Sequence, residues 1–168
     1  EFLKESRELI KDLRRLEPAD LSKLMNISQK LANENHQRFA NWHTPFNLKN
    51  AKQAIFAFKG DVYLGLQAEE FSVADLKFAQ DHLRILSGLY GILRPLDLIQ
   101  AYRLEMGRKF PSSSAQNLYD FWGDKLTRKI NKEFDSRTAN TKALVNLASN
   151  EYFNSINKSL LDAEVITP

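Results

Sequence analysis

The sequence of 168 residues contains no cysteine. This absence excludes disulfide scaffolds, zinc sites built on thiolates, iron–sulfur clusters and catalysis by a thiol nucleophile. It is typical of a protein from a reducing compartment. Glycine and proline are also scarce, with six and five residues, which excludes collagen-like and other glycine–proline repeats.

Long apolar runs are missing as well. A membrane-spanning helix needs roughly 18 consecutive apolar residues. The longest apolar-rich region, 85–99, is interrupted by Arg94, Pro95 and Asp97. The N-terminal residues show no basic segment followed by an apolar core, so they do not resemble a signal peptide. The sequence therefore predicts no membrane association.

The residues that are present fit a globular protein. Apolar residues make up 43% of the chain, aromatic residues 11% and charged residues 27%. The length fits a single domain. We expect one domain over 1–168, with a helical pair over 1–45 and an α/β core over 46–168. The chain starts at Glu1 rather than Met and ends on a strand-like run, so we interpret it as part of a longer protein.

The apolar spacing predicts helices and strands in alternation. Helices are expected over about 2–16, 18–42, 73–82 and 116–134, and a capping box of Ser72 and Asp75 opens the third. Strands are expected over 54–58, 83–86, 102–106, 143–148 and 164–167. This order predicts a mixed α/β fold with a central mixed sheet flanked by helices.

Positive charge is concentrated in one part of the chain. The net charge is only +3, but residues 84–132 hold nine Lys and Arg against four Asp and Glu, an excess of five. Such an excess forms either a solvated face or a groove for phosphate-bearing partners.

Standard catalytic signatures are absent. The sequence has no phosphate-binding loop, no dinucleotide fingerprint, no zinc-protease motif and no nucleophile elbow. His36 and His43 lack a third ligand at a suitable spacing, so we expect packing or exposure rather than metal binding. His82 is expected to cap a helix. No metal and no cofactor is predicted.

Polar clusters follow several of the expected strands. In open sheets flanked by helices, ligands bind at the strand ends. An enzyme of unknown reaction would use these side chains, with Lys59, Asp61, Glu105 and Glu151 as catalytic candidates and Arg103 and Asn146 beside them. The clusters are equally consistent with ordinary turns.

Two glycines stand inside an apolar run. Gly88 and Gly91 lie between Arg84 and Arg94, which resembles a glycine hairpin that lets backbone N–H groups approach phosphates. The spacing is similar to that of a helix-hairpin-helix element, although that motif usually has its glycines two apart. We expect a tight turn with positive φ for at least one glycine.

These segments together resemble the signature blocks of the YaaA family. The blocks appear in order over about 21–168: 57–63 (AFKGDVY), 83–97 (LRILSGLYGILRPLD), 102–107 (YRLEMG), 120–123 (DFWG) and 146–153 (NLASNEYF). The segments that open and close family members, a strand with Ser-Pro-Ala-Lys and a lysine-rich stretch, are absent here.

The resemblance implies a bacterial, cytoplasmic peroxide-stress protein that limits iron-linked damage. It also implies binding of DNA, with little sequence preference, through a basic cleft and a helix-hairpin-helix-like element. On this reading the nucleic acid contacts a shared concave surface with these residues: Lys59, Arg84, Gly88, Gly91, Arg94 and Arg103. The enzyme described above, and a non-catalytic iron-binding or protein-interaction factor, remain alternatives. The oligomeric state is not predicted.

Overall fold

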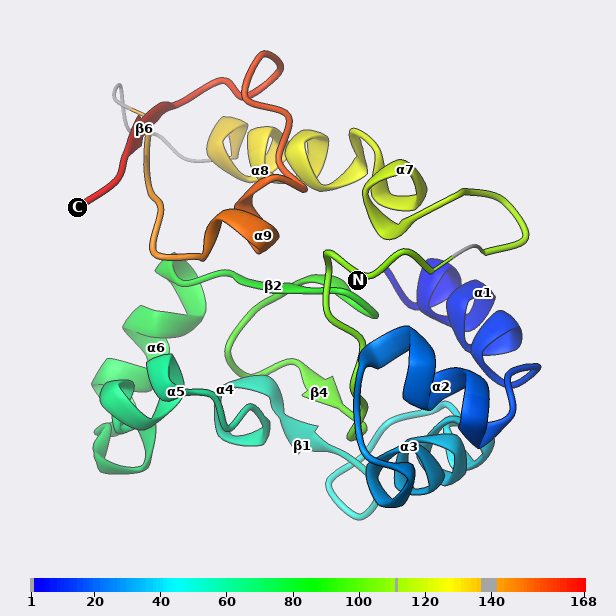
Figure 1. The fold of residues 1–168 in the computed structure, drawn as a ribbon. Helices are drawn as coiled ribbons and strands as arrows, with labels where there is room; N and C mark the ends of the chain where they lie inside the picture. Colours follow the sequence, from blue (N-terminus) through cyan, green and yellow to red (C-terminus); the bar gives the residue numbers. More distant parts are fainter. Residues whose placement is uncertain (1, 111, 137–141) are drawn as a thin grey trace. The chain divides into compact units, whose positions relative to one another are not determined.

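The computed structural model describes residues 2–110, 112–136 and 142–168 (Figure 1). They form two compact units, which divide between Leu104 and Glu105. Helices and short strands occur in both units, so the predicted mixed α/β class is confirmed. The helical segment 1–45 belongs to the first unit together with residues 46–104. The expectation of a single domain stays a prediction.

The first unit begins with three helices and ends with short strands. Its helical elements are α1 (Leu3–Leu13), α2 (Pro18–Met25), α3 (Gln29–Asn41), α4 (Ala54–Ala57), α5 (Asp61–Leu66), the 3-10 turn η1 (Ala68–Glu70) and α6 (Val73–His82). Its strands are β1 (Lys52–Gln53), β2 (Ile85–Ser87), β3 (Gly91–Leu93) and β4 (Leu98–Ile99).

The second unit is built on two consecutive helices and a parallel ladder. Its elements are α7 (Leu118–Trp122), α8 (Lys125–Asp135), β5 (Ala143–Val145), α9 (Asn150–Phe153) and β6 (Glu164–Ile166). Among the described residues of the whole chain, no helix is long and apolar enough to cross a membrane.

Three helices, rather than the expected pair, open the chain. The predicted helix over 18–42 is interrupted at Asn26, which adopts the left-handed conformation with φ of 51°. Asn tolerates this conformation better than other non-glycine residues, so it ends α2. Ser28 then caps α3 by accepting a hydrogen bond from the Leu31 N–H at 3.3 Å. The helical spacing of apolar residues continues across Asn26, so this spacing does not indicate that α2 ends there.

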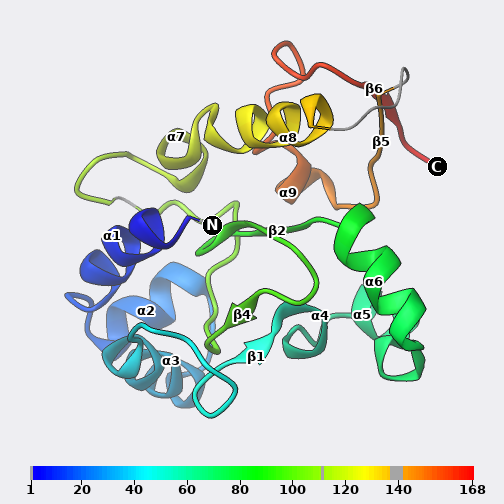
Figure 2. The same cartoon turned by 180° about the vertical axis from the view of Figure 1, so that it is seen from behind.

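Arg14 joins α1 to the end of α3. Its guanidinium group donates hydrogen bonds to the carbonyl oxygens of Phe39, Ala40 and Trp42, at 2.9, 3.1 and 2.5 Å. Carbonyl groups at a helix C-terminus have no partner within the helix, and the helix dipole favours a cation there. The three N-terminal helices therefore lie together, as Figures 1 and 2 show.

The central sheet predicted from the sequence is wrong for the described residues. The strands there form three separate two-stranded ladders, β1–β4 and β2–β3 antiparallel and β5–β6 parallel. Each strand has only two or three residues, so each ladder has few backbone hydrogen bonds and no ladder shares a strand with another. The segment 102–106, expected as a strand, forms none.

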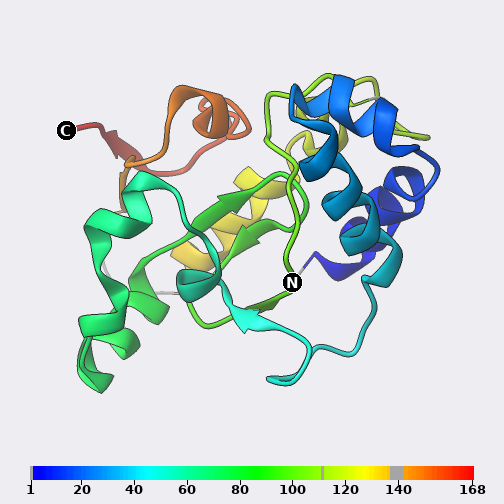
Figure 3. The same ribbon diagram turned by 60° about the horizontal axis from the view of Figure 1, so that its bottom comes forward.

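The two glycines lie in the β2–β3 hairpin (Figure 3). Ser87 pairs with Gly91 in the ladder, and Gly91 has φ of 72°, so the expected positive φ is confirmed. The helix-hairpin-helix interpretation of this segment is wrong, because strands flank the turn on both sides. Ile85 and Ile92, which are buried, explain the strands: β-branched side chains favour extended backbone.

Two other expected elements differ in detail. The sequence predicts a strand over 54–58, but α4 occupies Ala54–Ala57, where the Phe58 N–H donates to the Ala54 carbonyl oxygen at 3.2 Å in the helical pattern. The helix expected over 116–134 is divided at Gly123, which has φ of 47° and ends α7. The helix over 73–82 and its capping box are confirmed as α6.

The phenol of Tyr90 is the polar centre of the first unit. Its hydroxyl group accepts hydrogen bonds from Trp42 Nε1 at 2.9 Å and from the Gln100 N–H at 3.1 Å, and donates to the Gln100 carbonyl oxygen at 3.1 Å. Tyr90 is only 3% exposed. Burial raises the pKa of Tyr90 to about 12, because the phenolate would be poorly solvated.

Replacing Tyr90 by Phe removes this hydroxyl group and leaves the Trp42 and Gln100 donors unpaired. We expect the free energy of unfolding at pH 7 to fall by about 1–3 kcal/mol, measured by urea denaturation. Because the folded pKa lies above the unfolded value, wild-type stability from this group is complete below pH 10. It should decline by roughly 2–3 kcal/mol as the pH rises from about 10 to 12. A variant with the same pH dependence as the wild type would contradict this account.

Candidate functional site

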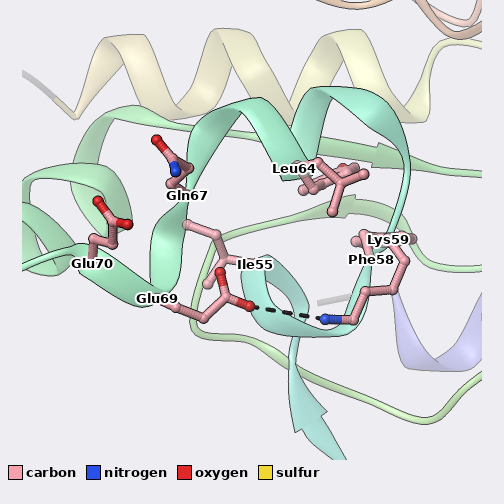
Figure 4. Close-up of a pocket in the computed structure, with 8 residues that line it drawn as sticks. Ile55, Phe58, Lys59, Leu64, Gln67, Glu69 and Glu70 are labelled. Carbon is pink, nitrogen blue, oxygen red and sulfur yellow. Dashed lines mark ion pairs between the residues drawn. The ribbon is translucent and has the colours of Figure 1, made fainter.

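Lys59 lines a cavity of about 160 Å³ in the first unit (Figure 4). The residues around the cavity come from α4, α5 and η1 and the loops beside them: Ile55, Phe58, Lys59, Tyr63, Leu64, Gln67, Glu69 and Glu70. Lys59 Nζ lies 3.8 Å from Glu69 Oε1, and both side chains are about two-thirds exposed. Since the cavity holds one cation and two carboxylates, its field does not favour phosphate.

The other predicted site residues of the first unit do not line this cavity. Asp61, a catalytic candidate, is the first residue of α5 and is exposed. Arg84 donates hydrogen bonds to the carbonyl oxygens of Gln80 and Leu83, at 3.1 and 2.7 Å, and so caps the end of α6. Arg103 is exposed.

Arg94 is held by its neighbour. Its guanidinium group lies 3.5 Å from Asp97 Oδ1, and its backbone N–H donates to Asp97 Oδ2 at 2.9 Å. The side chain is 44% exposed, and its buried Nε has no partner among the described residues. The common concave surface predicted for Lys59, Arg84, Arg94 and Arg103 thus stays a prediction.

The glycine turn is buried rather than open. Gly88 and Gly91 are both buried, and Leu89 between them has no exposed surface. The hydroxyl group of Ser6, in α1, donates to the Leu89 carbonyl oxygen at 3.0 Å. Backbone N–H groups must reach the surface to bind a phosphate. This geometry therefore speaks against the phosphate role that the sequence assigned to the turn.

A second hollow, of about 680 Å³, lies between the start of α1, the loop at 44–46 and the segment 93–98. Its charged lining residues are Arg7 and Asp97, one of each sign, and Phe2, Phe46 and leucine side chains form most of the rest. Arg7 donates a hydrogen bond to the hydroxyl group of Thr44 at 3.0 Å. A largely apolar lining with no net charge does not suit a phosphate.

In the second unit the structure brings together two of the predicted carboxylates around the segment 105–108. Glu151 Oε1 accepts a hydrogen bond from the Gly107 N–H at 2.8 Å. Glu105 Oε2 accepts from Arg108 Nε at 2.5 Å. A β-carbon on Gly107 would lie 3.0 Å from Glu151 Cγ, so the close approach of the carboxylate depends on glycine at this position.

Tyr119 completes this cluster. Its hydroxyl group donates to the backbone carbonyl oxygen of Glu151 at 2.8 Å. The pKa of Tyr119 is raised above its usual value, first by desolvation and second by the negative charge of Glu151. Asn146 does not join the cluster: it is buried, and its Oδ1 accepts from the Ala148 N–H at 3.1 Å. Glu105, Gly107, Arg108, Tyr119 and Glu151 are called the carboxylate cluster below.

The carboxylate cluster has no metal-ligand arrangement. Within the described part of the chain, no group of three or more His, Asp or Glu side chains is placed to hold a metal ion. His36 Nδ1 and His43 Nδ1 lie 3.1 and 2.8 Å from backbone carbonyl oxygens, of Leu16 and Asn41. His82 is the last residue of α6 and stacks on Phe78, with ring centroids 4.1 Å apart.

A row of exposed cations runs along α8, which the sequence analysis counted but did not single out. Lys125, Arg128 and Lys132 are three and four residues apart, so they lie on one face of the helix. All three are exposed, Arg128 by 74% of its side chain. The carboxylate of Asp124, the N-cap residue, lies 3.8 Å from Arg128 and accepts no capping hydrogen bond from the helix N–H groups. These three residues are called the α8 cation row.

Lys129, by contrast, is a cation of α8 that an acid neutralises. It lies between the members of the row in sequence, but its Nζ is 3.2 Å from Glu133 Oε1, and both side chains are largely buried. The helical period was the signal that could have separated Lys125, Arg128 and Lys132 from Lys129 before the structure was known.

Replacing Glu151 by Gln removes a negative charge beside Tyr119 and should lower the pKa of that phenol. The pKa should stay above its usual value, because desolvation, the larger cause, remains. A titration of ¹³C-labelled tyrosine by NMR measures the change. Glu105→Gln is the matched control and should leave the pKa of Tyr119 unchanged. An identical pKa in wild type and Glu151→Gln would contradict the geometry of the carboxylate cluster.

Comparison with known proteins identifies relatives over nearly the whole chain. A UPF0246 protein of Cellvibrio japonicus is 56% identical over 168 residues, which are 100% of this chain and 64% of that protein. UPF0246 proteins of Burkholderia lata and Burkholderia vietnamiensis are 54% and 52% identical over 167 residues, 99% of this chain and 64% of each relative. The chain thus spans 64% of the length of these relatives.

A family model supports the same assignment. The model described as peroxide stress protein YaaA matches residues 1–168, which confirms the resemblance inferred from the sequence blocks. The chain therefore belongs to the family of the peroxide stress protein YaaA.

Proposed function

We propose that the full-length protein binds duplex DNA with little sequence preference, and that it serves the peroxide-stress response by protecting against iron-linked oxidative damage. The single observation that supports this most is the α8 cation row. Three exposed cations on one helix face can contact successive phosphates, and such contacts provide affinity without reading sequence.

The electrostatics of α8 strengthen the proposal. The N-terminus of a helix carries a partial positive charge, and cations there are unfavourable for the helix itself. Lys125 is the first residue of α8, Arg128 lies one turn further, and the first turn contains no acid. The partial positive charge of the helix and the charges of Lys125 and Arg128 therefore add at this end, and the carboxylate of the N-cap residue Asp124, 3.8 Å from Arg128, offsets only part of them. The resulting positive potential attracts an anion such as a phosphate.

Lack of sequence preference follows from the residue types. Reading of bases in the major groove usually relies on Arg, Asn or Gln side chains that reach base edges. The exposed face of α8 is dominated by two lysines and one arginine, and lysine acts mainly as a point charge toward phosphate. We infer contacts to the DNA backbone and not to the bases.

The sequence also predicts a basic cleft with Lys59, Arg84, Arg94 and Arg103. We keep this cleft only as an alternative DNA-binding surface, which a separate variant tests below. Lys59 and Arg94 lie close to acids, and Arg84 caps α6. Phosphate contacts by these side chains would require that they leave these partners. Phosphate contacts by the α8 cation row would give up one ion pair, Arg128 with Asp124 at 3.8 Å, and one hydrogen bond, from Lys125 Nζ to the Phe121 carbonyl oxygen at 3.2 Å. The row differs from the earlier set in that its three cations lie on one helix face.

A second candidate function is an enzyme that acts at the carboxylate cluster. The observation that favours it is the fixed position of Glu151, whose carboxylate binds the Gly107 N–H and whose charge raises the pKa of Tyr119. A phenol with a raised pKa beside a carboxylate is typical of acid–base sites, but also of structural clusters. An enzyme would bind a small substrate with weak salt dependence, unlike a phosphate binder.

The triple variant Lys125→Ala/Arg128→Ala/Lys132→Ala of the full-length protein, which lacks three positive charges, should bind duplex DNA more weakly, by a similar factor for every sequence. The slope of log affinity against log salt should decrease in magnitude by roughly 2–3, as expected for three lost phosphate contacts. Gel-shift titrations at several salt concentrations measure both quantities.

The matched control removes three exposed lysines of the first unit, Lys11→Ala/Lys23→Ala/Lys30→Ala, and should keep the wild-type slope. The double variant Arg84→Ala/Arg94→Ala tests the earlier cleft. A reduced slope there, with the α8 variant unchanged, would move the DNA interface to that surface. Salt-independent binding by the wild type would favour the enzyme instead.

A further inference from the structure

The β5–β6 ladder of the second unit is firmly held at one end. Lys142, just before β5, donates hydrogen bonds to Asp135 at the end of α8, at 2.7 Å, and to Asp162, just before β6. These two carboxylates raise the pKa of Lys142. Two backbone hydrogen bonds lie at the ends of the ladder. The Glu164 N–H donates to the Lys142 carbonyl oxygen at 3.0 Å, and the Asn146 N–H donates to the Ile166 carbonyl oxygen at 2.7 Å.

One face of this ladder carries the exposed pair Ala143 and Glu164 at its start and exposed aliphatic side chains at its other end. Val145 lies directly opposite Ile166 in the parallel register, so both side chains project on the same side. Their exposed fractions are 55% and 46%, and Leu147, two residues further, is 65% exposed. The opposite face, with Leu144 and Val165, is half-buried. The exposed face is the anomaly, because parallel sheets are normally covered on both sides.

The edges of the ladder are also incomplete. Among residues 2–110, 112–136 and 142–168, no third strand pairs with β5 or β6 (Figure 2). The N–H groups of Asn146 and Glu164 point into the ladder. Since the direction of the N–H groups alternates along a strand, those of Val145 and Val165 point to the two outer edges. A two-stranded sheet with open edges is marginally stable and readily accepts a further strand.

The comparisons indicate what is available to cover this surface. The chain spans 64% of its curated relatives, so about a third of each relative lies outside the matched residues. We propose that a β-strand from that remaining part of the full-length protein adds to an edge of the β5–β6 ladder, and that the same part covers the face of Val145 and Ile166. This inference is independent of the proposed DNA binding.

Strand addition explains both anomalies with one partner. Main-chain hydrogen bonds to the added strand would satisfy the outward N–H group of Val145 or of Val165. Covering the aliphatic face would remove Val145, Leu147 and Ile166 from water, which is favourable at about 25 cal/mol per Å² of apolar surface. A second copy of the chain could satisfy the same edge, and the test separates this alternative by its dependence on protein concentration.

The test measures hydrogen–deuterium exchange of the full-length protein at single-residue resolution. We expect the amide of Val145 or of Val165 to exchange slower by a factor of ~10 or more than the amide of Leu48, a residue that is 72% exposed, at every protein concentration. Exchange at both positions as fast as at Leu48 would overturn the proposal. Protection that disappears on dilution would also overturn it, because the occupant would then be a second copy.

A substitution gives an independent measurement. Val145→Asp in the full-length protein places a charge on the covered face and should lower Tm by about 4–8 °C. Val62→Asp is the matched control, since Val62 is 69% exposed on α5, and it should change Tm by less than about 1 °C. Equal effects of the two variants, or no effect of Val145→Asp, would contradict a covered ladder. If Val145→Asp fails to fold while Val62→Asp folds, the covered face is supported.

Discussion

The Tyr90 hydroxyl group is the constraint on which the first unit depends. It joins Trp42 at the end of α3, the β2–β3 turn that contains Tyr90, and Gln100 beyond β4, and it uses its one donor and both acceptor positions to do so. A buried polar group without a partner costs about 1–3 kcal/mol. Moving Tyr90 would leave the Trp42 and Gln100 groups without their partner, so the β2–β3 turn that contains Tyr90 must stay buried. The sequence motif most suggestive of phosphate binding, Gly88 to Gly91, is thereby a structural turn.

Local signals in the sequence predicted local structure well. The capping box of Ser72 and Asp75 needs only four residues, and α6 begins where it indicates. The glycine turn needed one positive φ, and Gly91 supplies it. The breaks at Asn26 and Gly123 were missed because apolar residues keep their helical spacing on both sides, although both are residue types that often end a helix. The prediction of a single central sheet was wrong because strand pairing depends on contacts between distant residues.

The candidate site was less predictable than the fold, because the site depends on which charged side chains form ion pairs. The sequence shows how many cations a segment has, but not which of them a carboxylate neutralises. Arg94 bonds to Asp97 three residues away, while Lys59 lies near Glu69. Glu151 was selected for its place after a strand, and its binding to Gly107 could not be foreseen across 44 residues. The α8 cation row alone was visible in the helical period.

The α8 helix breaks a rule that stable helices follow. Acids belong in the first turn and bases in the last, yet α8 begins with Lys125, and Arg128 follows. Asp124, the N-cap residue, offsets only part of this charge: its Oδ2 lies 3.8 Å from Arg128, while its Oδ1 accepts a hydrogen bond from Asn157 at 2.9 Å and caps no N–H group of the helix. Local rules broken at a cost in stability are most often found at functional sites. The unfavourable start of α8 is therefore an argument for function that is separate from charge counting, because it depends on where the cations lie and not on their number.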